Sequence, residues 1–186
     1  MANPIRNGYE ALDSLIMKGV NTGVRAYNWT TGGTKAGLAN NLLTAASIID
    51  SSAAMISPFP MILAPLIIPV SFCASHIFQN INKKIEEREL KAQESGALDL
   101  YAETLKRNQK ANGYTYGMFG TLMLIPSNYL FAYGLSAGFG ARAFSSFVMN
   151  ADNLPPRKNC VARGLDKLSD IVQSYQPKPA PSPVPA

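Results

Sequence analysis

Charged side chains are missing from two long stretches of this chain. Residues 51–82 and residues 111–141 contain no Asp, Glu, Lys or Arg. Each stretch is longer than the roughly 20 apolar residues that a helix needs to cross a bilayer. A soluble helical domain spreads its charges along the chain, because each surface helix keeps a polar face. The missing charge therefore predicts an integral membrane protein. A soluble helical interaction domain is the competing interpretation, supported by a mean hydropathy of only +0.00.

The side chains that carry most protein chemistry are also scarce. The chain has two cysteines and one histidine. Cys73 lies in the first uncharged stretch and Cys160 in a polar segment, so we predict neither a disulfide nor a metal site. No nucleophile pairs with a base in the sequence pattern, and no glycine-rich phosphate loop follows a strand. The sequence predicts a non-enzymatic protein without a cofactor.

Positive charge exceeds negative charge, with 17 Lys and Arg against 12 Asp and Glu. The basic residues are not gathered into one patch with interleaved aromatic side chains, which argues against nucleic acid as a partner. They flank the uncharged stretches instead. The bilayer is the partner that this distribution predicts, with self-association or a larger membrane complex in addition.

Prolines divide the first apolar region, residues 36–82, whose length is about two membrane crossings. Pro58 and Pro60 are hard to keep inside one helix, because each removes a hydrogen-bond donor and crowds the preceding turn. They predict a turn between helices 36–56 and 61–82, which together form a first membrane hairpin. Pro65 and Pro69 lie four residues apart, and we expect them to kink the second helix or to break it.

The second apolar region, residues 111–150, has a similar length and a turn-like break around Pro126. It predicts a second membrane hairpin. Its glycines form two GxxxG patterns, which allow close approach of helix backbones in a membrane. Packing within this chain is the default interpretation and homodimerisation is the sharper hypothesis. The glycines are Gly113 and Gly117 in the first pattern, and Gly134 and Gly138 in the second.

The predicted fold class is an all-α integral membrane protein with about four membrane segments in two hairpins. Short amphipathic helices lie at both ends of the chain, and a charged helical connector joins the hairpins. The predicted segments are an interfacial segment (1–35), hairpin 1 (36–82), the connector (83–110), hairpin 2 (111–150), an amphipathic helix (151–176) and a proline-rich disordered tail (177–186).

The distribution of basic residues predicts the topology. If each uncharged stretch crosses once, the basic residues divide almost evenly between the two sides. If each apolar region is a hairpin, all 17 lie on one side. The positive-inside rule favours the second arrangement and places both termini and the connector in the cytoplasm. Shallow hairpins that enter and leave through the cytoplasmic face fit the same count.

Three ionisable residues other than Tyr and Cys are predicted at bilayer depth: Asp50, His76 and Arg142. Such groups are costly in lipid and are functional candidates. Asp50 is the strongest candidate, while His76 is expected near the interface. We expect Arg142 to extend to the cytoplasmic headgroups. The helix rise separates it from Asp50 by about 10 Å along the membrane normal, which argues against an ion pair.

The sequence therefore predicts a structural, membrane-shaping or complex-subunit role. A minimal channel or transporter is the alternative, with helix 61–82 as its proline-broken element and Asp50 as its polar site. A soluble interaction domain is the third hypothesis.

Overall fold

The computed structural model describes residues 4–96, 99–125 and 129–174. Within those ranges the chain forms helices and no strand, which confirms the all-helical part of the predicted fold class. The helices are α1 (Pro4–Thr31), α2 (Lys35–Met55), α3 (Pro60–Ser95), α4 (Leu100–Leu124), α5 (Leu130–Val148) and α6 (Cys160–Ser174).

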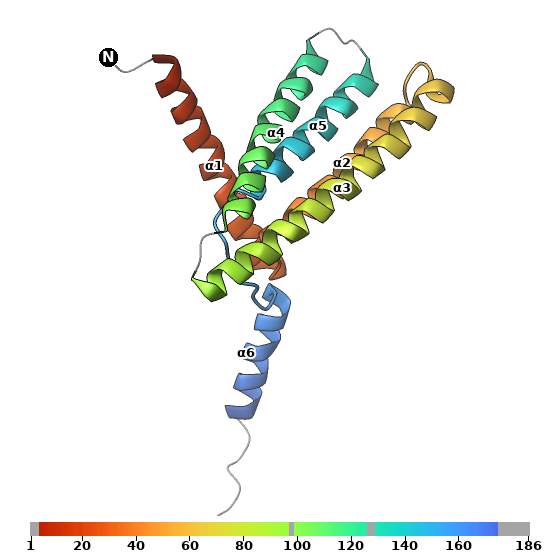
Figure 1. The fold of residues 1–186 in the computed structure, drawn as a ribbon. Helices are drawn as coiled ribbons and strands as arrows, with labels where there is room; N and C mark the ends of the chain where they lie inside the picture. The colour runs from red at the N-terminus through yellow and green to blue at the C-terminus, as the bar shows by residue number, and fades with distance from the viewer. Residues whose placement is uncertain (1–3, 97–98, 126–128, 175–186) are drawn as a thin grey trace, which may run out of the picture.

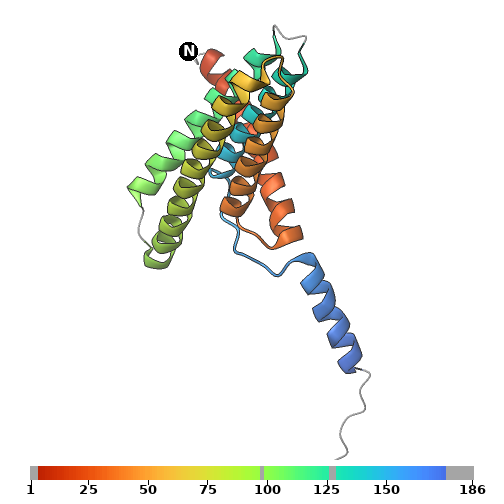
Figure 2. The ribbon, with the colours of Figure 1, turned by 90° about the vertical axis from the view of Figure 1, so that its right-hand side faces the viewer.

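Helices α2 to α5 form a four-helix body in the spatial order α3, α2, α5, α4. Helix α2 packs extensively against both α3 and α5, and α4 packs against α5, whereas α3 and α4 touch little. Figure 1 shows the α2–α3 pair and the α4–α5 pair diverging from one another. Helix α1 crosses the lower part of α5 and α2, and α6 extends away from the body (Figures 1 and 2).

Two ends of this body differ in character, and we name them by their connections. The connector end comprises the start of α2, the end of α3, the start of α4 and the end of α5, with the part of α1 that packs on them. The turn end comprises residues 44–77, 116–125 and 129–142, around the break between α2 and α3. Helix α2 begins at the connector end, where the Thr34 hydroxyl accepts a hydrogen bond from the Gly37 N–H. Helix α4 begins there too, where the Asp99 carboxylate accepts hydrogen bonds from two backbone N–H groups.

Prolines at the turn end act in two ways. Residues 56–59 separate α2 from α3, with Pro58 in the break and Pro60 as the first helical residue of α3, where a missing N–H costs nothing. Pro65 and Pro69 lie inside α3, which is helical from Pro60 to Ser95, so of the two expected outcomes, a kink or a break, the break is wrong. Packing of α3 against α2 overrides the proline preference. Pro126 lies outside the described residues.

Apolar side chains are buried mainly at the connector end. The core there joins α1, α2, α3 and α5. Its largest fully buried members are Val20, Val24, Ile85, Val148 and Met149.

One helix among the described residues, α3, is long and apolar enough to cross a membrane, and only 17% of its apolar window is buried. Polar residues lower the hydropathy of α2 and α5, and charged residues occupy the first turns of α4. The sequence-based prediction of four membrane segments is therefore not established by helix length and composition.

Candidate functional site

A buried ion pair joins α2 to α5 at the turn end. The Arg142 Nη1 atom lies 2.5 Å from Asp50 Oδ2, and the two side chains are 6% and 8% exposed. The Ser71 hydroxyl of α3 donates a hydrogen bond to Asp50 Oδ2 at 3.0 Å and accepts one from Arg142 Nη2 at 2.7 Å. Three helices therefore meet at one polar cluster, which we call the Asp50–Ser71–Arg142 cluster.

The prediction that Arg142 extends to the headgroups, unpaired with Asp50, is wrong. The Cα–Cβ bonds of a helix tilt toward its N-terminus. Helices α2 and α5 run antiparallel, because Gly134 of α5 lies beside Ala53 of α2 while Ser145 bonds to Ala39. The side chains of Asp50 and Arg142 therefore lean toward one another. The long arginine side chain spans the remaining distance. The estimate of about 10 Å compared only the heights of the two residues along the helices and left out the reach of their side chains.

Glycines of α5 make room for the carboxylate. A Cβ atom on Gly138 would lie 1.8 Å from Asp50 Oδ1, and one on Gly134 would lie 2.7 Å from the Ala53 Cβ. These two glycines allow α5 to approach α2 closely enough for the ion pair. In the other GxxxG pattern, a Cβ on Gly113 would lie 3.0 Å from the Phe147 ring, whereas nothing lies within 4 Å of a Cβ on Gly117.

Below the cluster, hydrogen-bonding side chains continue along the α2–α3 interface toward the connector end. The Ser47 and Ser75 hydroxyls are 2.6 Å apart, and Gln79 Nε2 donates to Thr44 Oγ1 at 3.0 Å. We call this row the polar seam; it comprises Asn40, Thr44 and Ser47 of α2 with Ser71, Ser75, Gln79 and Asn82 of α3. The seam was not predicted from the sequence, although its α3 positions 71, 75, 79 and 82 follow helical spacing, which is the signal that could have revealed it.

His76 does not join Asp50 and Arg142. Its side chain is exposed on α3, one residue away from the seam. Cys73 and Cys160 are exposed free thiols. Across the described residues, no group of three or more His, Cys, Asp and Glu side chains could hold a metal ion.

The Asp50–Ser71–Arg142 cluster forms the polar part of a groove between α3 and the α4–α5 pair. The cavity has a volume of about 370 Å³. Apart from the cluster, apolar and aromatic side chains of three helices form its walls. They are Leu66, Ile67, Val70 and Ala74 of α3, Tyr116 and Met123 of α4, and Leu135 and Phe139 of α5.

A second buried ion pair lies at the connector end. Lys35 Nζ is 2.9 Å from Glu89 Oε2 and donates a hydrogen bond to the Ala151 carbonyl, and Lys106 Nζ is 2.9 Å from Glu89 Oε1. Burial lowers the pKa of Lys35, and Glu89 offsets part of that change. Burial alone would raise the pKa of Glu89, but Lys35 and Lys106 outweigh it, so that the pKa is lowered.

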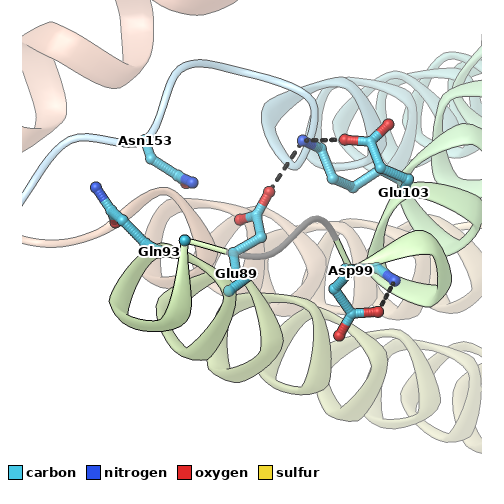
Figure 3. A pocket seen from close by; sticks show the side chains of 9 residues that line it. Glu89, Gln93, Asp99, Glu103 and Asn153 are labelled. Carbon is cyan, nitrogen blue, oxygen red and sulfur yellow. Dashed lines mark hydrogen bonds and ion pairs between the residues drawn. The ribbon is translucent and has the colours of Figure 1, made fainter.

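Beside this pair lies a polar cavity of about 450 Å³. Figure 3 shows Glu89 and Glu103 bonded to one ammonium group, which belongs to Lys106. Asp99 lies on another side of this cavity, where it caps α4. Each carboxylate here already has a structural partner, so the arrangement holds α2, α3 and α4 together.

Helix α1 is attached to α4 by a third charged contact. Asp13 Oδ2 lies 2.7 Å from Lys110 Nζ, and the Tyr114 hydroxyl donates to Asp13 Oδ1 at 2.5 Å. Burial alone would raise the pKa of Asp13, but these two partners lower it. The contact attaches the N-terminal half of α1 to α4.

No family model, curated protein or solved structure matches this chain. Over the part of the chain that the structure describes, the fold is helical, one helix is long and apolar enough to cross a membrane, and a polar cluster is buried among three helices.

Proposed function

We propose that this chain is a non-enzymatic integral membrane protein, with its turn end in the bilayer and a structural role in a membrane or a membrane complex. One observation carries the proposal: at the turn end, polar side chains are buried and large apolar ones are exposed. As whole residues, Asp50, Ser71 and Arg142 are each 5% exposed, whereas Met61 is 92% and Leu66 is 62% exposed. Water favours the opposite arrangement, while lipid tolerates this one.

The exposed apolar side chains surround the body. They come from all four helices of the turn end, and include Ile48 and Met55 of α2, Ile62 and Val70 of α3, Met118 and Leu122 of α4, and Leu130 and Tyr133 of α5. One partner protein would cover one face of such a surface. A bilayer covers all faces at once, so it is the environment that this distribution favours.

The lengths of the uncharged helix segments indicate that the helices enter the bilayer to different depths. The uncharged part of α3 that follows Pro60 is about 33 Å long, which matches the roughly 30 Å hydrocarbon core. The uncharged part of α4, residues 111–124, is about 21 Å long. We infer that the α2–α3 pair crosses the bilayer and that α4 enters it less deeply. The basic residues at the connector end favour a cytoplasmic location for that end, according to the positive-inside rule.

The amphipathic end helices support a membrane-shaping or subunit role. Leu12 and Leu15 of α1 are exposed, as are Leu165 and Leu168 of α6. Such faces attach to a bilayer surface or to a partner helix. Deletion of α6 should reduce liposome remodelling at high protein density, while leaving insertion of the four-helix body intact.

The native cysteines test the membrane location without any substitution. Both thiols are exposed in the structure. In open membrane fragments, a charged maleimide should label Cys160 at once, and Cys73 only after detergent is added. Cys73→Ser and Cys160→Ser assign the two signals. Full labelling of Cys73 before detergent, or release of the protein by alkaline carbonate, would overturn the proposal.

Topology needs two introduced thiols in a cysteine-free background. Phe59 is 63% exposed in the break between α2 and α3, and Glu94 is exposed near the end of α3. In sealed right-side-out vesicles, Phe59→Cys should be labelled from outside and Glu94→Cys only after lysis. Labelling of Glu94→Cys from outside would contradict the cytoplasmic connector. Labelling of neither thiol would indicate shallow insertion.

A minimal channel or carrier is a second candidate, which the ion pair beside an open groove favours. Carriers place ionisable groups on the substrate path. Flux through proteoliposomes that stops with Asp50→Asn, at unchanged protein level, would support this function over the structural one. Equal liposome permeability with and without the protein would rule it out.

A further inference from the structure

The polar cluster offers hydrogen-bond donors without a net charge. A guanidinium carries five N–H donors, and the described contacts of Arg142 use one for Asp50 and one for Ser71. The Asp50 carboxylate balances the positive charge, and its Oδ1 atom, which accepts no hydrogen bond within the described residues, packs against Gly138 of α5. A charged ligand would pay a desolvation cost that no counter-charge here offsets. A neutral acceptor such as a carbonyl oxygen fits the remaining donors.

The remaining walls of the groove are apolar and fit the hydrocarbon part of a ligand. Val70 and Leu66 of α3 and Phe139 and Leu135 of α5 line the same cavity. Its volume of about 370 Å³ falls in the range of roughly 300–1,000 Å³ that is typical of small-molecule sites. The groove is open between α3 and α4, and the exposed Leu66 and Val70 continue its wall onto the apolar surface.

We propose that this groove binds a small apolar molecule with a neutral carbonyl-type acceptor, dissolved in the bilayer. The carbonyl oxygen accepts a hydrogen bond from Arg142, and the apolar body lies between α3 and α5. This inference rests on the proposed membrane location. The groove residues of α3, from Leu66 to Ala74, lie about 9–21 Å along the helix from Pro60. That depth is within the hydrocarbon core, below the ester groups of the bilayer lipids.

An alkyl-substituted benzophenone is a suitable probe, because it is an apolar ketone that attaches to nearby C–H bonds under light. The full chain would be reconstituted in phosphatidylcholine nanodiscs, illuminated with the probe and mapped by mass spectrometry. We expect saturable labelling of residues 66–74 and 135–139. A long-chain aliphatic ketone should compete with the probe, whereas the alkane of equal length should compete far less.

A matched pair of variants locates the site. Ala74→Leu fills the groove and should lower the saturable labelling at least about tenfold, as added methylenes do in small pockets. Cys73→Leu adds similar bulk at the neighbouring exposed position, which does not line the groove, and should leave labelling unchanged. If Ala74→Leu fails to fold, competition between the probe and the long-chain ketone on the unmodified chain still tests whether the groove is a saturable site.

Several outcomes would overturn the inference: labelling that does not saturate, equal competition by ketone and alkane, or equal effects of the two variants. Replacing ester lipids by ether lipids should not change the labelling. An increase would mean that lipid ester carbonyls occupied the groove, and would overturn the assignment to a dissolved molecule. Maleimide protection of Cys73 in unmodified nanodiscs separates the two proposals. A protected Cys73 without saturable labelling defeats only the groove site, and a reactive Cys73 defeats the membrane location.

Discussion

The two ends of the four-helix body are stabilised by opposite arrangements of the same residue types. At the connector end, Val20, Ile85 and Met149 are buried, while charged side chains such as Arg25 and Arg88 form ion pairs at the surface. At the turn end, serines and an ion pair are buried, while Met61 and its neighbours are exposed. Burial of apolar surface stabilises a fold in water, whereas close contacts of small residues and interhelical hydrogen bonds hold helices together in lipid.

Each end also buries one ion pair, and the two pairs differ in their surroundings. Glu89 at the connector end has two lysine partners and a polar cavity beside it. Asp50 at the turn end has Arg142 and Ser71, beside a groove with mainly apolar walls. An ion pair without water around it depends wholly on its partners. The comparison therefore predicts that removing one partner of the ion pair lowers the free energy of unfolding more at the turn end than at the connector end.

Arg142→Ala should have the largest effect. It leaves the Asp50 carboxylate buried with only the Ser71 hydroxyl as a partner, and breaking a buried pair in this way costs about 3–5 kcal/mol. Denaturant unfolding in detergent micelles would measure the loss of unfolding free energy. Arg6→Ala is the control, because Arg6 forms an exposed pair with Glu10 and should change stability by less than about 0.5 kcal/mol.

A double-variant cycle sharpens this prediction. Asp50→Asn combined with Arg142→Ala removes the uncompensated charge, so the double variant should be more stable than Arg142→Ala alone. Equal stability of the two would show that the carboxylate does not depend on the guanidinium. The comparison between the two ends would then lose its main support.

Glu89→Gln tests the connector end. It should lower the free energy of unfolding by about 1.5–3 kcal/mol at neutral pH, which is less than the loss for Arg142→Ala. Because the folded pKa of Glu89 is lowered, its carboxylate stabilises the fold above the ordinary pKa of 4.5 and loses this contribution as pH falls through the folded pKa. The Tm difference between wild type and variant should therefore shrink in acid. A difference that stays constant down to pH 3 would contradict the role of the charge. Glu103→Gln, at a 59% exposed side chain, is the matched control.

Gly138→Ala should lower the free energy of unfolding by about 1–3 kcal/mol, because the new methyl group displaces the Asp50 carboxylate or separates α5 from α2. Gly140→Ala is the matched control on the same helix, since nothing lies within 4 Å of its Cβ position. Alanine favours a helix over glycine, so this control should stabilise by up to about 1 kcal/mol. Thermal unfolding of both variants would reveal the difference, and similar Tm values would show that α2 and α5 adjust without cost.

Sequence patterns predict the helical fold and locate the break at Pro58 and Pro60, because two prolines so close together leave no continuous helix. The same rule fails at Pro65 and Pro69, where packing of α3 against α2 decides the outcome. A local pattern therefore identifies candidate breaks, while tertiary contacts select among them.

The candidate site is harder to predict. Asp50 and Arg142 stand out as ionisable residues in apolar surroundings, but their pairing depends on the relative direction and height of α2 and α5. Ser71 gives no such signal alone. It becomes visible only as one member of a helically spaced row with Ser75 and Asn82. Residue types thus indicate which groups need a partner, and helix packing determines which partner they find.

The smallest predicted effect concerns that row. Ser75→Ala removes the hydroxyl that donates to the Leu43 carbonyl and contacts Ser47. Hydrogen bonds between membrane helices contribute about 0.6 kcal/mol on average, because separated helices in lipid also find partners. Ser52→Ala is the control, since the exposed Ser52 hydroxyl bonds within its own helix. A loss above about 2 kcal/mol for Ser75→Ala would mean that the seam itself holds α2 and α3 together. A loss near 0.6 kcal/mol would leave the ion pair as the main polar contact of the turn end.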